Sequence, residues 1–186
     1  GDLDKNYELV KNELLNAGIA VAVSKTSSPV TQGWSDSWGF EWAGKDPNDK
    51  TDFDRLAADE GLVKTAGLQI VQGRDFNLKE FPTDSTGMII NESALKTMKF
   101  KDPIGQLVKD GDQQFHIVGV IKDFILSSPY YPTKPMIIEG SKSGWFKTAG
   151  ALLAKPGFVF VLLQIAIGWV LYTQKFASVP LFVNGT

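Results

Sequence analysis

The sequence contains no cysteine and a single histidine, His116. The absence of cysteine excludes disulfide bonds, thiolate metal sites and cysteine nucleophiles, and one histidine cannot build a His-rich metal site. Basic residues are not in excess, because 19 lysines and arginines stand against 21 aspartates and glutamates, which gives a formal net charge of -2. Nucleic-acid binding requires a clustered basic face, so we expect no nucleic-acid partner.

A phosphate-binding loop is also missing, because the stretch GLVKTAG at 61–67 lacks the Gly-Lys-Ser/Thr ending of that motif. We therefore expect no bound nucleotide and no other cofactor. The composition is otherwise that of a globular chain, with 43% hydrophobic and 22% charged residues among 186. That is enough for one domain with a hydrophobic core. Gly1 is typical of the remnant of tag cleavage, so we expect no targeting signal.

Hydrophobic spacing and turn residues predict the secondary structure. The expected elements are a helix at 3–16, a strand at 19–25, a helix at about 54–66, strands within 68–76 and 86–93, a helix at 92–100, a hairpin at 106–124 with an Asp-Gly turn, and a strand at 135–140. No regular alternation of strand and helix is sustained. The order predicts an α+β domain with a mixed or mostly antiparallel sheet and packed helices.

The composition changes towards the C-terminus, where no charged residue lies between Lys155 and Lys175. That run is close to the roughly 20 residues that a membrane-spanning helix needs. Trp169 and Tyr172 would then lie near one interface. A buried helix or paired core strands would explain the run as well. We therefore divide the chain into a domain at 1–146 and an apolar segment at 147–186, either a membrane span or a buried element.

The tetrapeptide Gly73-Arg74-Asp75-Phe76 allows two interpretations. Asp75 could be a catalytic base with Arg74 as an anion clamp, but such chemistry needs a positioned nucleophile and a second group. The sequence offers no Gly-x-Ser-x-Gly motif, and its one histidine is far along the chain. The favoured interpretation is structural: Gly73 adopts a positive φ at a strand end, Arg74 and Asp75 bond the turn, and Phe76 enters the core. We expect no enzymatic activity.

Other polar residues also favour structural roles. Asn91 and Glu92 could form a metal pair, but an asparagine and a glutamate at this position are typical of a helix N-terminus. The aspartates between 46 and 54 lack the spacing of a calcium loop, which favours a solvated loop. His116 is more typical of a structural residue than of a ligand. We expect no metal site.

Three tryptophans allow two interpretations, a binding surface or part of the core. Trp34, Trp38 and Trp42 share their parity with Phe40, so all four would lie on one face of an extended chain. Exposed aromatic residues on one face can bind sugars or peptides, whereas buried ones would simply form core. The alternative function is thus a soluble carbohydrate- or peptide-binding module that uses Trp34, Trp38 and Trp42.

Four short motifs in a fixed order resemble the periplasmic core domain of MacB-like and FtsX-like ABC transporter permeases. In that family, a strand ending in Gly-Arg-Asp-Phe is followed by Asn-Glu at the start of a helix, then by Asp-Pro-Ile-Gly, then by a strand with Val-Gly-Val-x-Lys-Asp-Phe. The matching residues here are Gly73, Arg74, Asp75 and Phe76; Asn91 and Glu92; Asp102, Pro103, Ile104 and Gly105; and Val118, Gly119, Val120, Lys122, Asp123 and Phe124.

The resemblance implies a domain inserted between the first two membrane helices of a permease in the bacterial inner membrane and facing the periplasm. It implies a cytoplasmic ABC ATPase as partner, a periplasmic or outer-membrane partner protein, and membrane attachment through flanking helices. Transporters of this kind act by mechanotransmission, in which ATP-driven movement of the helices moves the outer domain. The resemblance therefore implies that the charged motif residues stiffen the junctions between strands and helices and catalyse nothing.

Overall fold

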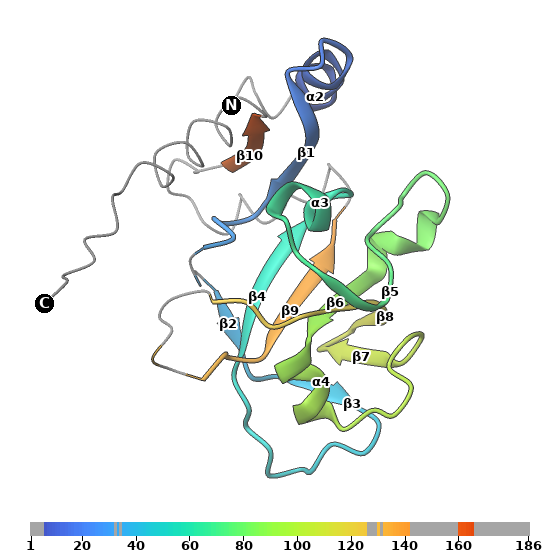
Figure 1. The fold of residues 1–186 in the computed structure, drawn as a ribbon. Helices are drawn as coiled ribbons and strands as arrows, with labels where there is room; N and C mark the ends of the chain where they lie inside the picture. Colours follow the sequence, from blue (N-terminus) through green and yellow to red (C-terminus); the bar gives the residue numbers. More distant parts are fainter. Residues whose placement is uncertain are drawn as a thin grey trace, which may run out of the picture.

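The computed structural model describes residues 6–31, 33, 35–125, 130 and 132–141, together with the backbone of 160–165. Ten strands form one sheet (Figure 1). They are β1 (Ala20–Thr26), β2 (Asp36–Ser37), β3 (Phe40–Trp42), β4 (Phe53–Ala58), β5 (Ile70–Gly73), β6 (Gly87–Asn91), β7 (Leu107–Asp110), β8 (Gln113–Ile121), β9 (Met136–Gly140) and β10 (Phe160–Ile165). The helices are α2 (Tyr7–Asn16), α3 (Leu62–Ala66), α4 (Glu92–Met98) and the 3-10 helix η1 (Pro82–Thr86).

The sheet has the order β10-β1-β4-β9-β6-β8-β7-β3, with β2 paired to β4 and β5 paired to β8. The pairs β4–β9 and β6–β8 are parallel, and the other described pairs are antiparallel. The predicted α+β class with a mixed sheet is therefore confirmed. The expected hairpin is present as well: Asp110 pairs with Gln113 across a turn in which Gly111 has a φ of 57°.

The central strands are buried on both faces, and their side chains alternate between two hydrophobic clusters. On β6, Met88 and Ile90 belong to one cluster and Ile89 to the other. On β9, Ile137 joins the first cluster and Ile138 the second. This alternation follows from the two-residue period of a strand. Each fully buried side chain of this size contributes about 1.5–3 kcal/mol of transfer free energy.

The helices lie at different ends of the sheet. Ala94 and Met98 of α4 pack into the first cluster, and Leu62 and Val63 of α3 pack into the second. Helix α2 lies on β1 at the end farthest from α4 (Figure 1). It begins at Tyr7, so the described part of the predicted helix at 3–16 is confirmed.

The predicted helix at 54–66 is wrong in its first half. Residues 53–58 form strand β4, and a short helix begins only at Leu62, after Gly61 with a φ of 86°. The spacing of Phe53, Leu56 and Ala57 fits one face of a helix, but Leu56, Ala57 and Ala58 are all buried. Strand β4 lies between β1 and β9, and pairing on both edges overrides the local helical pattern.

The sheet also includes a strand from the apolar C-terminal segment. Residues 160–165 form β10, which pairs antiparallel with β1 from Ala20↔Ile165 to Thr26↔Phe160. The rest of the predicted segment at 147–186 lies outside the described residues. Among the residues that the structure describes, none of the helices has the length and apolar character to cross a membrane.

Candidate functional site

The loop after β5 is built around a close approach of two glycines. Gly73 has a φ of 71°, as predicted, and pairs with Gly119 on β8. A Cβ at Gly73 would lie 2.2 Å from the carbonyl oxygen of Val118, and a Cβ at Gly119 would lie 2.3 Å from that of Arg74. No side chain fits at either position, so both motif glycines are required by packing.

Arg74 holds this loop in place by pairing with Asp84, a residue that sequence reasoning missed. The guanidinium lies 2.5 Å and 3.0 Å from the two carboxylate oxygens of Asp84 and stacks on the ring of Phe81. Asp84 is fully buried and also accepts the backbone N–H of Asn77. Burial alone would raise the pKa of Asp84, but the bonds from Arg74 and Asn77 outweigh it and hold the pKa below its usual value.

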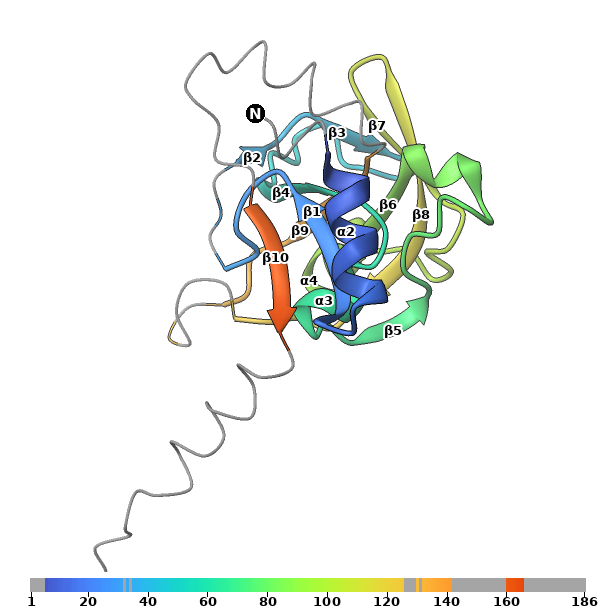
Figure 2. The same ribbon diagram turned by 90° about the horizontal axis from the view of Figure 1, so that it is seen from above.

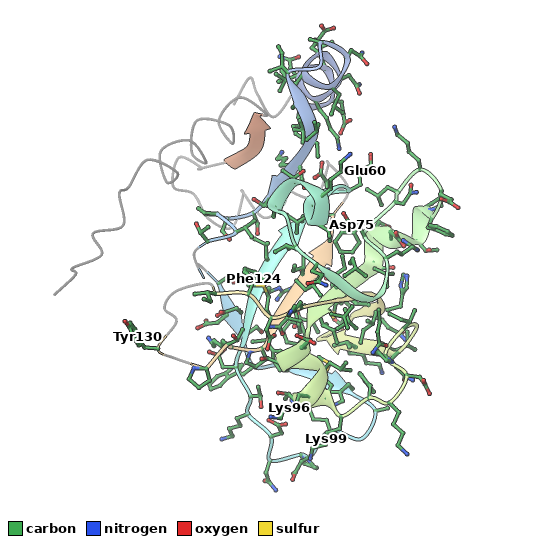
Figure 3. The ribbon with its side chains drawn as sticks, viewed as in Figure 1. Glu60, Asp75, Lys96, Lys99, Phe124 and Tyr130 are labelled. Carbon is green, nitrogen blue, oxygen red and sulfur yellow. The ribbon has the colours of Figure 1, made fainter. Side chains whose placement is uncertain are left out.

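Asp75 and Phe76 complete the loop as predicted. Asp75 accepts the backbone N–H of Phe76 at 2.8 Å and that of Val63 at 3.1 Å, and Val63 lies in the first turn of α3. Burial raises the pKa of Asp75, and these two bonds oppose the rise. Phe76 is buried in the second cluster. Figure 3 places Asp75 beside α3, away from Lys96 and Lys99 at the bottom of the view.

Asn91 is the N-cap of α4, as predicted. Its Oδ1 accepts the backbone N–H of Ala94 at 2.9 Å and that of Met136 at 2.8 Å, and its Nδ2 donates to the carbonyl of Lys134 at 3.0 Å. The side chain therefore joins the start of α4 to the start of β9. Both polar atoms of this side chain are thus engaged in hydrogen bonds within the protein.

Glu92 and Asp123 join α4 to the end of β8. Asp123 accepts from the backbone N–H of Ser93 at 3.0 Å and from its hydroxyl at 2.6 Å, while Glu92 accepts the backbone N–H of Asp123 at 3.1 Å. Phe124 packs against the second cluster. Val120 is buried in the first cluster.

The Asp102-Pro103-Ile104-Gly105 motif forms a turn against β8. Pro103 is buried, and its carbonyl accepts the N–H of Gln106 at 3.1 Å. Gly105 has a φ of 84° and donates to Ile117 at 2.7 Å. Helix α4 ends before this motif, at Met98, two residues before the predicted end at 100, and its C-cap Lys99 has a left-handed φ of 58°.

A shallow open depression lies beside this turn, and Gly73, Arg74, Gly105 and His116 contribute to its lining. Arg74 lines it with a guanidinium that Asp84 already neutralises. Arg74, Asp75 and Glu92 do not form one catalytic grouping. Arg74 pairs with Asp84, Asp75 accepts N–H groups of Val63 and Phe76, and Glu92 accepts that of Asp123.

The tryptophans do not form one exposed face. Trp42 is buried and packs edge-to-face on Phe53 at 5.8 Å, whereas Trp38 is 69% exposed. The prediction that they share a face is therefore wrong for this pair: β2 ends at Ser37 and β3 begins at Phe40, so Trp38 and Trp42 do not lie in one continuous strand. Trp34 lies outside the described residues.

The aspartates between 46 and 54 divide between two roles. Asp46 and Asp49 accept backbone N–H groups two residues ahead, at Asn48 and Thr51. Asp52 and Asp54 lie 2.7 Å and 3.0 Å from the amine of Lys134. A lysine thus occupies the position between carboxylates that a cation would take. Within the described residues, no group of three or more His, Cys, Asp or Glu side chains is arranged to hold a metal ion.

A second buried polar cluster, which sequence reasoning also missed, surrounds Asp59. Asp59, which follows β4, is 6% exposed. It accepts from the hydroxyl of Tyr7 at 2.5 Å, from the hydroxyl of Ser24 at 2.6 Å and from the backbone N–H of Lys25 at 2.7 Å. Lys11 lies 3.4 Å away. The available sequence signal was an aspartate directly after an apolar run, in Ala-Ala-Asp.

Comparison with known protein families identifies the family of this chain. The family model described as the MacB-like periplasmic core domain matches residues 6–153. The chain belongs to this family. It is therefore a periplasmic or extracellular domain of the ABC transporter permease family, as the resemblance in the motifs implied. Among curated proteins, no sequence matches it significantly.

Two solved structures with TM-scores of 0.50 and 0.51 share the fold at low sequence identity. The extracellular domain of the noncanonic ABC-type transporter YknZ from Gram-positive bacteria has a TM-score of 0.51 at 17% identity, covering 86% of this chain and 74% of that one. A domain of a putative permease from Porphyromonas gingivalis has a TM-score of 0.50 at 16% identity, covering 88% and 74%. The periplasmic region of MacB from Actinobacillus actinomycetemcomitans has a TM-score of 0.46 at 17% identity, covering 91% and 82%.

Proposed function

We propose that this MacB-like domain is a passive moving part of a bacterial inner-membrane permease. It is inserted between the first two membrane helices and faces the periplasm. A cytoplasmic ABC ATPase supplies the energy, and the membrane helices transmit the movement to the domain. The domain passes that movement to substrate, or to a periplasmic or outer-membrane partner, and catalyses no reaction itself.

The observation that carries this proposal is that the polar motif residues hold elements together. Asn91 joins α4 to β9, and Asp123 joins α4 to β8. Arg74 and Asp84 fix the loop between β5 and η1. A part that transmits force must not deform at the junctions between its elements. Buried and paired polar groups give that stiffness because breaking such a pair leaves a desolvated charge or donor without a partner.

The same contacts argue against chemistry at these residues. A catalytic base or nucleophile needs a free face towards substrate and a second group within hydrogen-bond reach. Asp75 instead accepts two backbone N–H groups, and Asp123 accepts two groups of Ser93. The tryptophan-based binding module loses its basis because Trp42 belongs to the core.

The test measures movement and needs no knowledge of the substrate. The chain has no cysteine, so Asp112→Cys in the exposed β7–β8 turn gives this domain one labelling position. The full permease, with its ATPase, is placed in vesicles that carry an acceptor dye on the lipid. We expect energy transfer from the labelled turn to the membrane to change when ATP is added. No change in an ATP-hydrolysing sample would contradict the proposal.

A further inference from the structure

We propose that Asp59 is the residue that couples α2 to the core of the domain, so that movement entering through α2 reaches the sheet. This inference rests on the proposed function, because it assigns the transmission of movement to one carboxylate. It concerns a positioning residue, since Asp59 acts through the elements that it joins.

The two carboxylate oxygens of Asp59 serve two different elements. Oδ2 faces α2: it accepts from the hydroxyl of Tyr7 and lies 3.4 Å from the amine of Lys11. Oδ1 faces β1: it accepts from Ser24 and from the backbone N–H of Lys25. Asp59 itself directly follows β4, and its backbone N–H donates to the carbonyl of Lys25 at 3.0 Å. One buried group thus joins the N-terminal helix to two neighbouring strands.

Among the described residues, the buried apolar contact between α2 and the rest of the domain is small. Tyr7, Ala20 and Val23 form a cluster of their own, with Leu14 packed against it. That cluster is separate from the two clusters that line the sheet. Figure 2 shows α2 lying across β1, beside the edge strand β10. The attachment of α2 therefore depends on its polar contacts more than the attachment of α3 or α4 does.

Two lysine amines lie beside the Tyr7 ring at this joint. The amines of Lys11 and Lys25 lie 5.7 Å and 5.6 Å from the centre of the Tyr7 ring. Lys11 also lies 3.7 Å from Glu60, and Figure 3 places Glu60 next to α3. Burial, followed by the charge of Asp59, raises the pKa of the Tyr7 hydroxyl, so that hydroxyl stays protonated and donates.

An asparagine at this position cannot reproduce both sets of bonds. Asp59→Asn has one acceptor oxygen and one donor NH2 group, while all four partners of Asp59 are donors. One side of the joint must therefore face an NH2 group. The substitution should weaken the link between α2 and β1 with little change in volume. Tyr7→Phe is a milder variant that removes only the hydroxyl and keeps the ring.

The matched control is Asp49→Asn. Asp49 is also a carboxylate that accepts a backbone N–H and a hydroxyl, but both belong to Thr51 in the loop before β4, and Asp49 has no described contact with α2. Any effect of simply replacing a structural carboxylate should appear in both variants. An effect on α2 and on transmission should appear only in Asp59→Asn and, more weakly, in Tyr7→Phe.

The first measurement is amide hydrogen exchange on the full permease with its ATPase. Loss of hydrogen bonds to a charged group predicts exchange in α2 that is at least roughly tenfold faster in Asp59→Asn, with exchange in β6 and β8 unchanged. The control should change exchange only near Thr51. Unchanged exchange in α2, or equally faster exchange in every element, would overturn the proposal.

The second measurement applies the energy-transfer assay at Asp112→Cys to the same variants. We expect Asp59→Asn to hydrolyse ATP normally and to lose most of the ATP-dependent change, with the control unaffected. The double variant Tyr7→Phe/Asp59→Asn should lose no more than Asp59→Asn alone, since both residues act in one contact. A normal signal in Asp59→Asn refutes the role of Asp59 alone. A permease without substitutions in the joint that shows no ATP-dependent change refutes the proposed function instead.

Discussion

The side chain of Asn91 holds the first residue of β9 in place: its Oδ1 accepts the backbone N–H of Met136 at 2.8 Å. The two residues lie on adjacent antiparallel strands, β6 and β9. The same oxygen caps α4 through Ala94. One amide therefore fixes both the start of a helix and the start of a strand, which a backbone pairing alone would leave free to fray.

Replacement of Asn91 should therefore cost more than the loss of an ordinary helix cap. Asn91→Ala removes the cap, worth about 0.5–2 kcal/mol, and leaves the buried N–H of Met136 without its acceptor, worth about 1–3 kcal/mol. We expect the free energy of unfolding, measured in urea, to fall by about 2–4 kcal/mol. Asn48→Ala on an exposed loop is the control and should change it by less than about 0.5 kcal/mol. A similarly small loss at both positions would contradict the role of Asn91 in joining α4 to β9.

Gly119 should not tolerate even alanine. The new Cβ would lie 2.3 Å from the carbonyl oxygen of Arg74, so β5 and β8 would have to separate. We expect Gly119→Ala to lower the free energy of unfolding by at least about 1–3 kcal/mol. Gly39→Ala is the matched control, because nothing lies within 4 Å of its Cβ position. Equal thermal stability of the two variants would show that the strands do not approach this closely.

The Arg74–Asp84 pair should make stability depend on pH at the acid end. The folded state holds the pKa of Asp84 below its ordinary value. The charged carboxylate therefore contributes stability above its unfolded pKa of about 3.9, and this contribution is lost as the pH falls through the lower folded pKa. Asp84→Asn should lower the free energy of unfolding by about 1–3 kcal/mol at neutral pH.

The difference between the wild-type chain and Asp84→Asn should shrink as the pH falls below about 4. Urea unfolding at a series of pH values measures it. Asp112→Asn in an exposed turn is the control. A difference that stays constant down to the lowest pH would mean that the charge of Asp84 is not what stabilises the loop.

Truncation of the two described tryptophans in the aromatic stretch should change stability by very different amounts. Trp42→Ala removes a buried ring that contacts Phe53, and we expect a loss of about 3–5 kcal/mol in the free energy of unfolding. Trp38→Ala removes a ring that is 69% exposed and should change stability by less than about 0.5 kcal/mol. Denaturant unfolding followed by circular dichroism compares them. A large loss at Trp38 would show that it packs against the domain.

The sequence correctly predicts those structural features that residues a few positions apart determine. Gly73 and Asn91 were assigned correctly because a positive φ at a strand end and an N-cap are decided by residues within a few positions. The Asp-Gly hairpin was predicted for the same reason. The family motifs could also be recognised, since their order is preserved from Gly73 to Phe124.

Features that depend on distant partners could not be predicted in this way. Strand β4 was taken for a helix because its neighbours β1 and β9 come from positions far along the chain. The roles of Asp84 and Asp59 could not be predicted because each depends on a distant partner. Arg74 lies ten residues from Asp84, and Tyr7 lies 52 residues from Asp59. The parity of Trp38 and Trp42 predicted a shared face, but parity holds only within one strand.

The central claim is that the domain moves as one rigid part, and paired distances test it most directly. Spin labels at Asp112→Cys and Asn48→Cys lie on two exposed turns of the domain. Pulsed electron–electron distance measurements on the full permease compare the nucleotide-free and ATP-bound states. We predict the same distance distribution within the domain in both states, while the distance from either label to a label on a membrane helix changes. An ATP-dependent change between the two turns, with no displacement relative to the membrane, would contradict the account.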